Sequence, residues 1–214
     1  MRPQNRGSIM SKHVSDEMEQ GQGTKSDSQL SQKIEEFTQY LSRNPSDEKA
    51  WEQLGMAYLE LSDITNAIRC FDQVLNTNPE NNYALVAKGY LLLAKGEFDK
   101  AIEYFKKAIE HNRRNKKAWE GLAFTQILIE DTRSAINSYS AYLTLAPNNG
   151  LAWYHIAIAY AFEGLYEEAI FALETAMTID PSLSEDILEL LEIINSQIGL
   201  GNYEISDEEL VDGS

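Results

Sequence analysis

Residues 51–58 read WEQLGMAY, and the phrase returns as WEGLAFTQ at 119–126 and as WYHIAIAY at 153–160. The first residues of these phrases belong to one column of the sequence, in which positions follow each other at intervals of 34 residues. A second column at the same spacing holds only alanine: Ala67, Ala101, Ala135 and Ala169. A fixed period of this length is typical of a solenoid built from one repeated supersecondary unit.

Each repeated unit is predicted to contain two helices. Trp51, Leu54, Gly55 and Tyr58 fall at i, i+3, i+4 and i+7, which places them on one stripe of an α-helix. Ala67 begins a similar stripe on a second helix. Glycines in two of the links between the helices suit a helix C-cap, and residues that cap helices well precede each first helix. These positions are Gly96 and Gly164 for the links, and Asp47, Asn81, Asn115 and Asn149 for the caps.

The pattern closely resembles the tetratricopeptide repeat, whose signature is W-x2-L-G-x2-Y, then A-x3-F, then P. Residues 51–79 match every named position, whereas the second unit lacks the Trp and the third lacks the Gly and the first Tyr. The resemblance covers roughly residues 28–198. It implies an all-α fold, a right-handed superhelical α-solenoid with a concave peptide-binding groove.

The predicted organisation is a single repeat domain with a capping helix at each end. Phe37 and Leu41 are in phase with the second helices, so the first cap is the second helix of an absent or degenerate unit. The flanking segments 1–27 and 199–214 are polar and without periodicity, and we expect them to be disordered. The domain divides into a cap helix at 28–44, repeats at 48–81, 82–115, 116–149 and 150–183, and a cap helix at 184–198.

Composition excludes several classes of protein. The net charge of −16 argues against a general affinity for nucleic acid or for anionic membranes. No apolar run is long enough for a membrane span, and the start has no apolar segment of the kind found in signal peptides. Cys70 is the single cysteine, which fits a reducing compartment, and we expect a cytoplasmic location. Whether translation begins at Met1 or Met10 is left open.

Residues with catalytic potential are few and scattered. His13, His111 and His155 lie far from one another and from Cys70, so no zinc-binding spacing exists. No phosphate-binding glycine loop or nucleophile elbow is present. We therefore expect no enzyme activity, no metal and no cofactor, with His155 in a structural role and Cys70 an inert thiol.

The resemblance implies that the first helix of each unit lines the concave side. Three columns on that face hold twelve residues, of which ten are apolar or aromatic, whereas a merely solvated face would be charged. The alternative is that superhelical winding buries part of this face as core. The predicted partner-binding residues are Met56, Leu59, Tyr83, Val86, Tyr90, Leu93, Phe124, Ile127, Tyr154 and Ile158.

Some members of the family grip the carboxylate at the end of a chaperone tail with Lys and Asn side chains. Here only Lys49 and Lys117 are basic at the corresponding places, and each has a Glu three residues further on with which it can pair. Recognition of that kind is therefore not expected, and an apolar-anchored helix or extended segment is the better prediction.

Charge is unevenly spread along the chain. Residues 88–117 contain nine Lys or Arg and four acids, whereas residues 134–214 contain fourteen acids and no Lys or Arg. The basic cluster Arg113, Arg114, Lys116 and Lys117 is either a solubilising loop or a dock for an acidic partner, with the chain's own acidic tail as one candidate.

Together these features predict a cytoplasmic adaptor or scaffold that binds a peptide or an amphipathic helix of another protein in an apolar concave groove. The alternative is a self-associating structural solenoid, or homo-oligomer, whose apolar face packs on a second copy.

Overall fold

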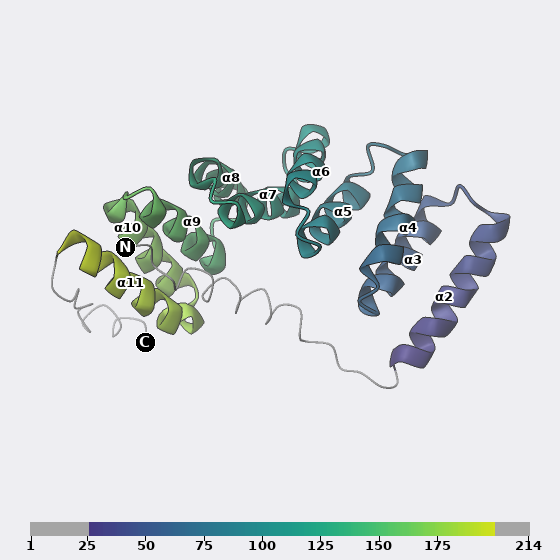
Figure 1. The fold of residues 1–214 in the computed structure, drawn as a ribbon, viewed down its shortest axis with the longest axis horizontal. Helices are drawn as coiled ribbons and strands as arrows, with labels where there is room; N and C mark the ends of the chain where they lie inside the picture. Colours follow the sequence, from purple (N-terminus) through teal and green to yellow (C-terminus); the bar gives the residue numbers. More distant parts are fainter. Residues whose placement is uncertain (1–25, 200–214) are drawn as a thin grey trace. The chain divides into compact units, whose positions relative to one another are not determined.

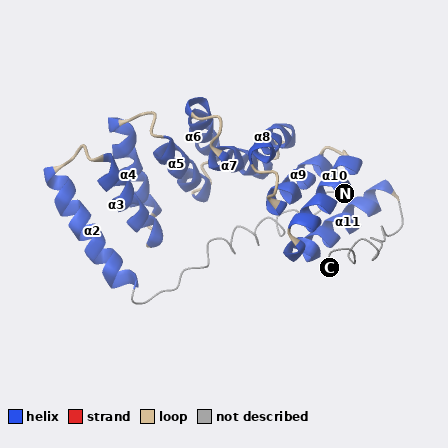
Figure 2. Cartoon of the chain, turned by 180° about the vertical axis from the view of Figure 1, so that it is seen from behind, coloured by secondary structure: helices blue, strands red, loops and turns tan. Residues whose placement is uncertain are grey.

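The computed structural model describes residues 26–199, which form two compact units. Unit 1 ends at Ala84 and unit 2 begins at Leu85. Helices, turns and loops make up the whole of the described region (Figure 2). The predicted tails, 1–27 and 199–214, lie almost entirely outside the described residues. Within residues 26–199, no helix combines the length and the hydropathy that crossing a membrane requires.

Unit 1 contains α2 (Ser26–Arg43), α3 (Glu48–Glu60), α4 (Ile64–Thr77) and the beginning of α5 (Asn82–Ala94). Helix α3 packs against α2 on one side and α4 on the other (Figure 1). The apolar stripes predicted from the sequence meet in the core of this unit. One cluster of that core consists of Leu41, Ala50, Leu54 and Cys70.

Unit 2 continues the alternation of 13- and 14-residue helices as far as α10. They are α6 (Phe98–His111), α7 (Lys116–Leu128), α8 (Thr132–Leu145), α9 (Gly150–Phe162) and α10 (Tyr166–Ile179), then a short 3-10 helix (Pro181–Leu183) and α11 (Ser184–Ile198). From α6 to α10 each helix packs on the next along the chain, and α11 packs on both α10 and α9. The prediction of an all-α fold built from repeated helix pairs is therefore confirmed.

The predicted helix caps are confirmed in all four repeats. The side-chain oxygens of Asp47, Asn81, Asn115 and Asn149 each accept a hydrogen bond from a backbone N–H three residues further on, at 2.8–3.1 Å. Each bond satisfies one of the N–H groups that the first turn of a helix leaves without a partner.

The turn within each repeat uses a left-handed residue at the same position. Gly96 and Gly164, expected to end helices, have φ of 74° and 75°. In the other two repeats Ser62 and Glu130 occupy the corresponding place, at φ of 57° and 61°. A left-handed residue at this point lets the chain turn directly into the second helix.

The tryptophan column does more than fill space between helices. Trp51 Nε1 donates to the carbonyl oxygen of Pro45, and Trp153 Nε1 donates to that of Pro147, both at 2.8 Å. Trp119 makes the same bond at 2.8 Å to Arg113, which replaces proline in its column. Because this hydrogen bond needs only a backbone carbonyl as acceptor, it is retained where Arg113 replaces proline.

Candidate functional site

The predicted groove residues divide into an exposed group and a buried group. Met56, Leu59 and Tyr83 are 36%, 37% and 46% exposed, and all three belong to unit 1. The seven others belong to unit 2, where Tyr90, Leu93 and Phe124 are half-buried. Val86, Ile127, Tyr154 and Ile158 are buried. The exposed apolar area among the predicted positions is therefore concentrated on unit 1.

Helix α11 accounts for burial at the end of the repeat array. It packs on α9, which carries Tyr154. Burial raises the pKa of Tyr154 to about 12, and the carboxylates of Asp186 and Glu189 on α11 add to the effect. A side chain in that position reaches solvent only if α11 moves.

Two half-buried positions are engaged within unit 2. The hydroxyl of Tyr90 donates to the carbonyl oxygen of Lys117 at 3.0 Å, and its ring meets Phe105 edge-on at 5.0 Å. Phe124 lies beside His155, with ring centroids 5.6 Å apart. His155 is also held by the hydroxyl of Tyr139, which lies 3.0 Å from its Nδ1, as a structural role requires.

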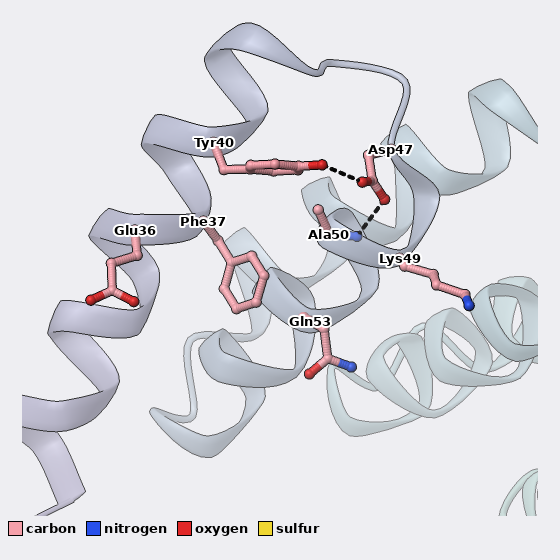
Figure 3. A pocket seen from close by; sticks show the side chains of 7 residues that line it. All are labelled: Glu36, Phe37, Tyr40, Asp47, Lys49, Ala50 and Gln53. Carbon is pink, nitrogen blue, oxygen red and sulfur yellow. Dashed lines mark hydrogen bonds between the residues drawn. The ribbon is translucent and has the colours of Figure 1, made fainter.

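A surface hollow of about 480 Å³ lies in unit 1 between α2 and α3 (Figure 3). Its walls combine two aromatic rings from α2 with four polar side chains, of which two come from α3. The lining residues are Glu36, Phe37, Tyr40, Asp47, Lys49, Ala50 and Gln53. Lys49 and Gln53 lie on the helix that also carries Met56 and Leu59, so α3 contributes to both features.

One wall of the hollow is fixed by a pair of hydrogen bonds that Figure 3 draws. Asp47 Oδ1 accepts from the backbone N–H of Ala50 at 3.0 Å, and Oδ2 accepts from the hydroxyl of Tyr40 at 2.9 Å. These two bonds, that of Ala50 above all, lower the pKa of the Asp47 carboxyl. The hydrogen bond between Tyr40 and Asp47 also raises the pKa of the Tyr40 hydroxyl. The Tyr40 ring is thus held at the edge of the hollow with 46% of its surface exposed.

The repeat register explains why a hollow forms here. Tyr40 precedes Val74 by 34 residues, and Phe37 precedes Phe71 by the same interval. Val74 and Phe71 are completely buried, because α4 packs against the first helix of its own repeat. Helix α2 has no such first helix among the described residues, so Tyr40 is exposed and Phe37 only half-buried.

Sequence reasoning missed Phe37 and Tyr40 as site residues. The signal was nevertheless present, since Phe37 was in phase with the second helices while no first-helix pattern preceded it. A second-type helix without its partner leaves its packing face uncovered. The missing inference was that this uncovered face forms a hollow together with α3.

Lys49 and Lys117, at the positions that correspond to the carboxylate-binding residues of other family members, have different surroundings. Lys117 pairs with Glu120, as expected, with Nζ 2.9 Å from Oε2. Glu52, the expected partner of Lys49, accepts from Asn81 Nδ2 at 2.8 Å. Arg113, Arg114, Lys116 and Lys117 are all exposed.

The remaining candidate for reactive chemistry is buried. Cys70 is 3% exposed, and burial raises the pKa of its thiol to about 12, so the thiolate is scarce at neutral pH. Among residues 26–199, no group of three or more His, Cys, Asp or Glu side chains is placed to hold a metal ion.

Comparison with known proteins places this geometry in a family. The model of the cytochrome c-type biogenesis protein H TPR domain matches residues 11–151, more than half of the chain. A second model, the tetratricopeptide repeat, matches residues 151–183. No curated protein sequence matches the chain.

Solved structures share the fold at low sequence identity. A MamA fragment from Desulfovibrio magneticus RS-1 is 19% identical at a TM-score of 0.68, covering 71% of this chain and 85% of its own. Another MamA structure has the same identity and TM-score and covers 84% and 96%. YrrB, described as a TPR protein with an unusual peptide-binding site, is 19% identical at 0.65 and covers 80% and 92%. Together with the family-model matches and the recurring helix pairs, these likenesses lead to one conclusion: the chain belongs to the tetratricopeptide-repeat family.

Proposed function

We propose that the chain is a non-catalytic interaction adaptor that binds an apolar peptide or an amphipathic helix of another protein through unit 1. The observation that carries the proposal is the exposure of Met56, Leu59 and Tyr83 in unit 1, the unit that also holds the hollow between α2 and α3. Large apolar side chains that remain exposed together in a folded protein mark a binding surface.

The chemistry of this surface favours an occupant with apolar anchors and few charges. Tyr83 lies edge-on to Phe71, with ring centroids 6.0 Å apart, so its ring is pre-positioned. A rigid aromatic ring loses little conformational entropy when it contacts a ligand. Gln53 and Lys49 at the rim of the hollow supply donors that can orient a peptide backbone.

Two further parts of the proposal concern partners and location. The net charge of −16 disfavours nucleic acid and anionic lipid as partners. The location proposed is the cytoplasm, on the basis of one buried thiol and no disulfide-forming partner for it in this sequence. Fractionation of cells expressing the tagged chain tests that location.

The binding proposal is tested by panning a phage-displayed peptide library with the full chain. Affinities of the selected peptides are then measured by calorimetry for the wild type and for Met56→Glu and Tyr83→Glu. Phe171→Glu is the matched control, because Phe171 is 63% exposed but belongs to unit 2 rather than to unit 1. We expect each unit 1 variant to weaken binding at least about tenfold, equivalent to 1.4 kcal/mol, and the control to leave it unchanged.

Equal affinity for all four proteins, with circular dichroism showing that each is folded, would overturn the proposal. Light scattering over a range of protein concentrations tests the alternative, in which a second copy of the chain occupies this surface. A molecular mass that rises with concentration in the wild type but not in Met56→Glu would assign the same surface to a second copy of the chain.

A further inference from the structure

A second hollow, of about 410 Å³, lies wholly within unit 2 between α6, α7 and α8. Trp119 and Leu122 of α7 and Ile109 of α6 provide its apolar wall. The other lining residues are polar: Lys106, Glu110, Gln126, Ser134, Asn137 and Ser138.

The following repeat has an aromatic ring at the corresponding position. Phe171 of α10 meets Trp153 edge-on there, with ring centroids 6.4 Å apart. The residue 34 positions before Phe171 is Asn137, and the one 34 positions before Tyr160 is Gln126. Beside Trp119, two smaller polar side chains therefore stand at positions where the next repeat has aromatic residues.

The floor of this hollow is prepared for a polar contact. Gln126 is only 6% exposed, and its Oε1 accepts a hydrogen bond from the hydroxyl of Ser138 at 2.7 Å. That bond orients the amide, whose N–H groups can donate to an occupant. A buried amide gains most from a partner that brings an acceptor together with an apolar group.

A basic rim adjoins the hollow. Lys106 lines it, and Trp119 is tied by its Nε1 to the carbonyl oxygen of Arg113 at 2.8 Å. Arg113, Arg114 and Lys116 are exposed. The lining of the hollow has one cation, Lys106, and one carboxylate, Glu110, so the excess of positive charge comes from the link between α6 and α7 to which Trp119 is tied. Together with the aromatic wall and the buried amide, this charge fits an acidic segment with an aromatic anchor.

We propose that residues 200–214 of the same molecule dock here, with the ring of Tyr203 in the hollow against Trp119. The segment contains five carboxylates and no Lys or Arg, so its charge complements the rim. It follows α11, which belongs to the same unit as the hollow. Tyr203 lies four residues beyond Gly199, so an extended chain carries it up to about 14 Å past the end of α11. Attachment to the chain raises the local concentration of the segment to the millimolar range, so weak contacts suffice.

The experiment replaces Tyr203 of the full chain with the photo-crosslinking residue p-benzoylphenylalanine. Irradiation is followed by mass spectrometry of the cross-linked peptides. We expect adducts of monomer mass that join position 203 to α6, α7 or α8, with a yield that falls as salt is added.

Variants of the hollow give the decisive comparison. Asn137→Phe places a ring beside Trp119, as Phe171 lies beside Trp153 in the next repeat, and it should reduce the adduct about tenfold, whereas the matched control Asn137→Ala should retain it. Arg113→Glu combined with Arg114→Glu should lower the yield while leaving the hollow open. Equal yields in Asn137→Phe and Asn137→Ala, adducts scattered over the surface, or adducts of dimer mass would each overturn the proposal.

Discussion

At the scale of single residues, the turn in each repeat requires a left-handed backbone conformation. Two of the four repeats adopt it at a residue other than glycine. Ser62 and Glu130 are left-handed, whereas the corresponding residues of the other repeats are Gly96 and Gly164. A residue with a Cβ atom has an energetic cost in this conformation, and glycine has almost none. The repeats therefore carry a local strain that the sequence column does not reveal by itself.

Glu130→Gly should therefore stabilise the protein. Relief of the left-handed strain outweighs the greater flexibility of glycine in the unfolded chain, and we expect a gain of about 0.5–1 kcal/mol. Gly164→Ala imposes the same strain on a turn that lacks it and should lower stability by a similar amount. Urea unfolding followed by circular dichroism measures both, and a loss of stability in Glu130→Gly would refute the account.

A second residue-scale feature is the packing of Phe105 between two glycines. A Cβ atom added to Gly89 would lie 2.6 Å from this ring, and one added to Gly121 would lie 2.3 Å from it. Both distances are far below van der Waals contact, so α5 and α7 approach the ring of α6 as closely as they do only because these residues lack side chains.

Gly121→Ala should consequently destabilise unit 2, by about 1–3 kcal/mol, because the ring of Phe105 must shift within a packed core. Replacing the ring with a smaller side chain makes room for the methyl group. The double variant Gly121→Ala/Phe105→Leu should therefore lose less stability than the sum of the two single changes. Strict additivity in urea melts would show that the two side chains do not collide.

At the scale of elements, the sequence predicted the helices and their caps well because both depend on local chemistry that recurs every 34 residues. The caps at Asp47 and Asn115 could be predicted from the residue type and its position within the 34-residue repeat. The tie from Trp119 to the carbonyl of Arg113 could not be predicted, because any residue supplies a carbonyl oxygen and the column shows only the change of side chain.

The candidate site was harder to predict than the helices that carry it. Met56 and Ile158 occupy the same predicted groove column, yet the first is 36% exposed and the second 8%. Their helices have different neighbours, since α11 packs on α9 at one end of the array, and periodicity carries no information about such an end. The hollow beside Tyr40 has the same origin, since it follows from a helix that lacks its usual neighbour among the described residues.

At the scale of the whole molecule, stability in a repeat protein is the sum of local units and of the interfaces between neighbours. Two probes within this chain report on different units. Cys70 is the buried thiol of α4 in unit 1, and Ile187 is a completely buried residue of α11 in unit 2. The thiol reacts only when its surroundings open, because burial raises its pKa to about 12.

Ile187→Ala should lower the stability of unit 2 by about 2–4 kcal/mol, since it leaves a cavity beneath α11. Hydrogen exchange should quicken most in α10 and α11, while labelling of Cys70 by a thiol reagent at neutral pH should remain as slow as in the wild type. Leu54→Ala, in the core that contains Cys70, is the matched variant and should accelerate labelling. The raised thiol pKa adds a control by pH. The folded state keeps the Cys70 thiol protonated at pH values at which the unfolded state releases that proton. The contribution of this group to the free energy of unfolding is therefore constant below the unfolded pKa and falls as the pH rises from there toward 12. Labelling of Ile187→Ala as rapid as that of Leu54→Ala would mean that the chain opens as one cooperative block rather than unit by unit.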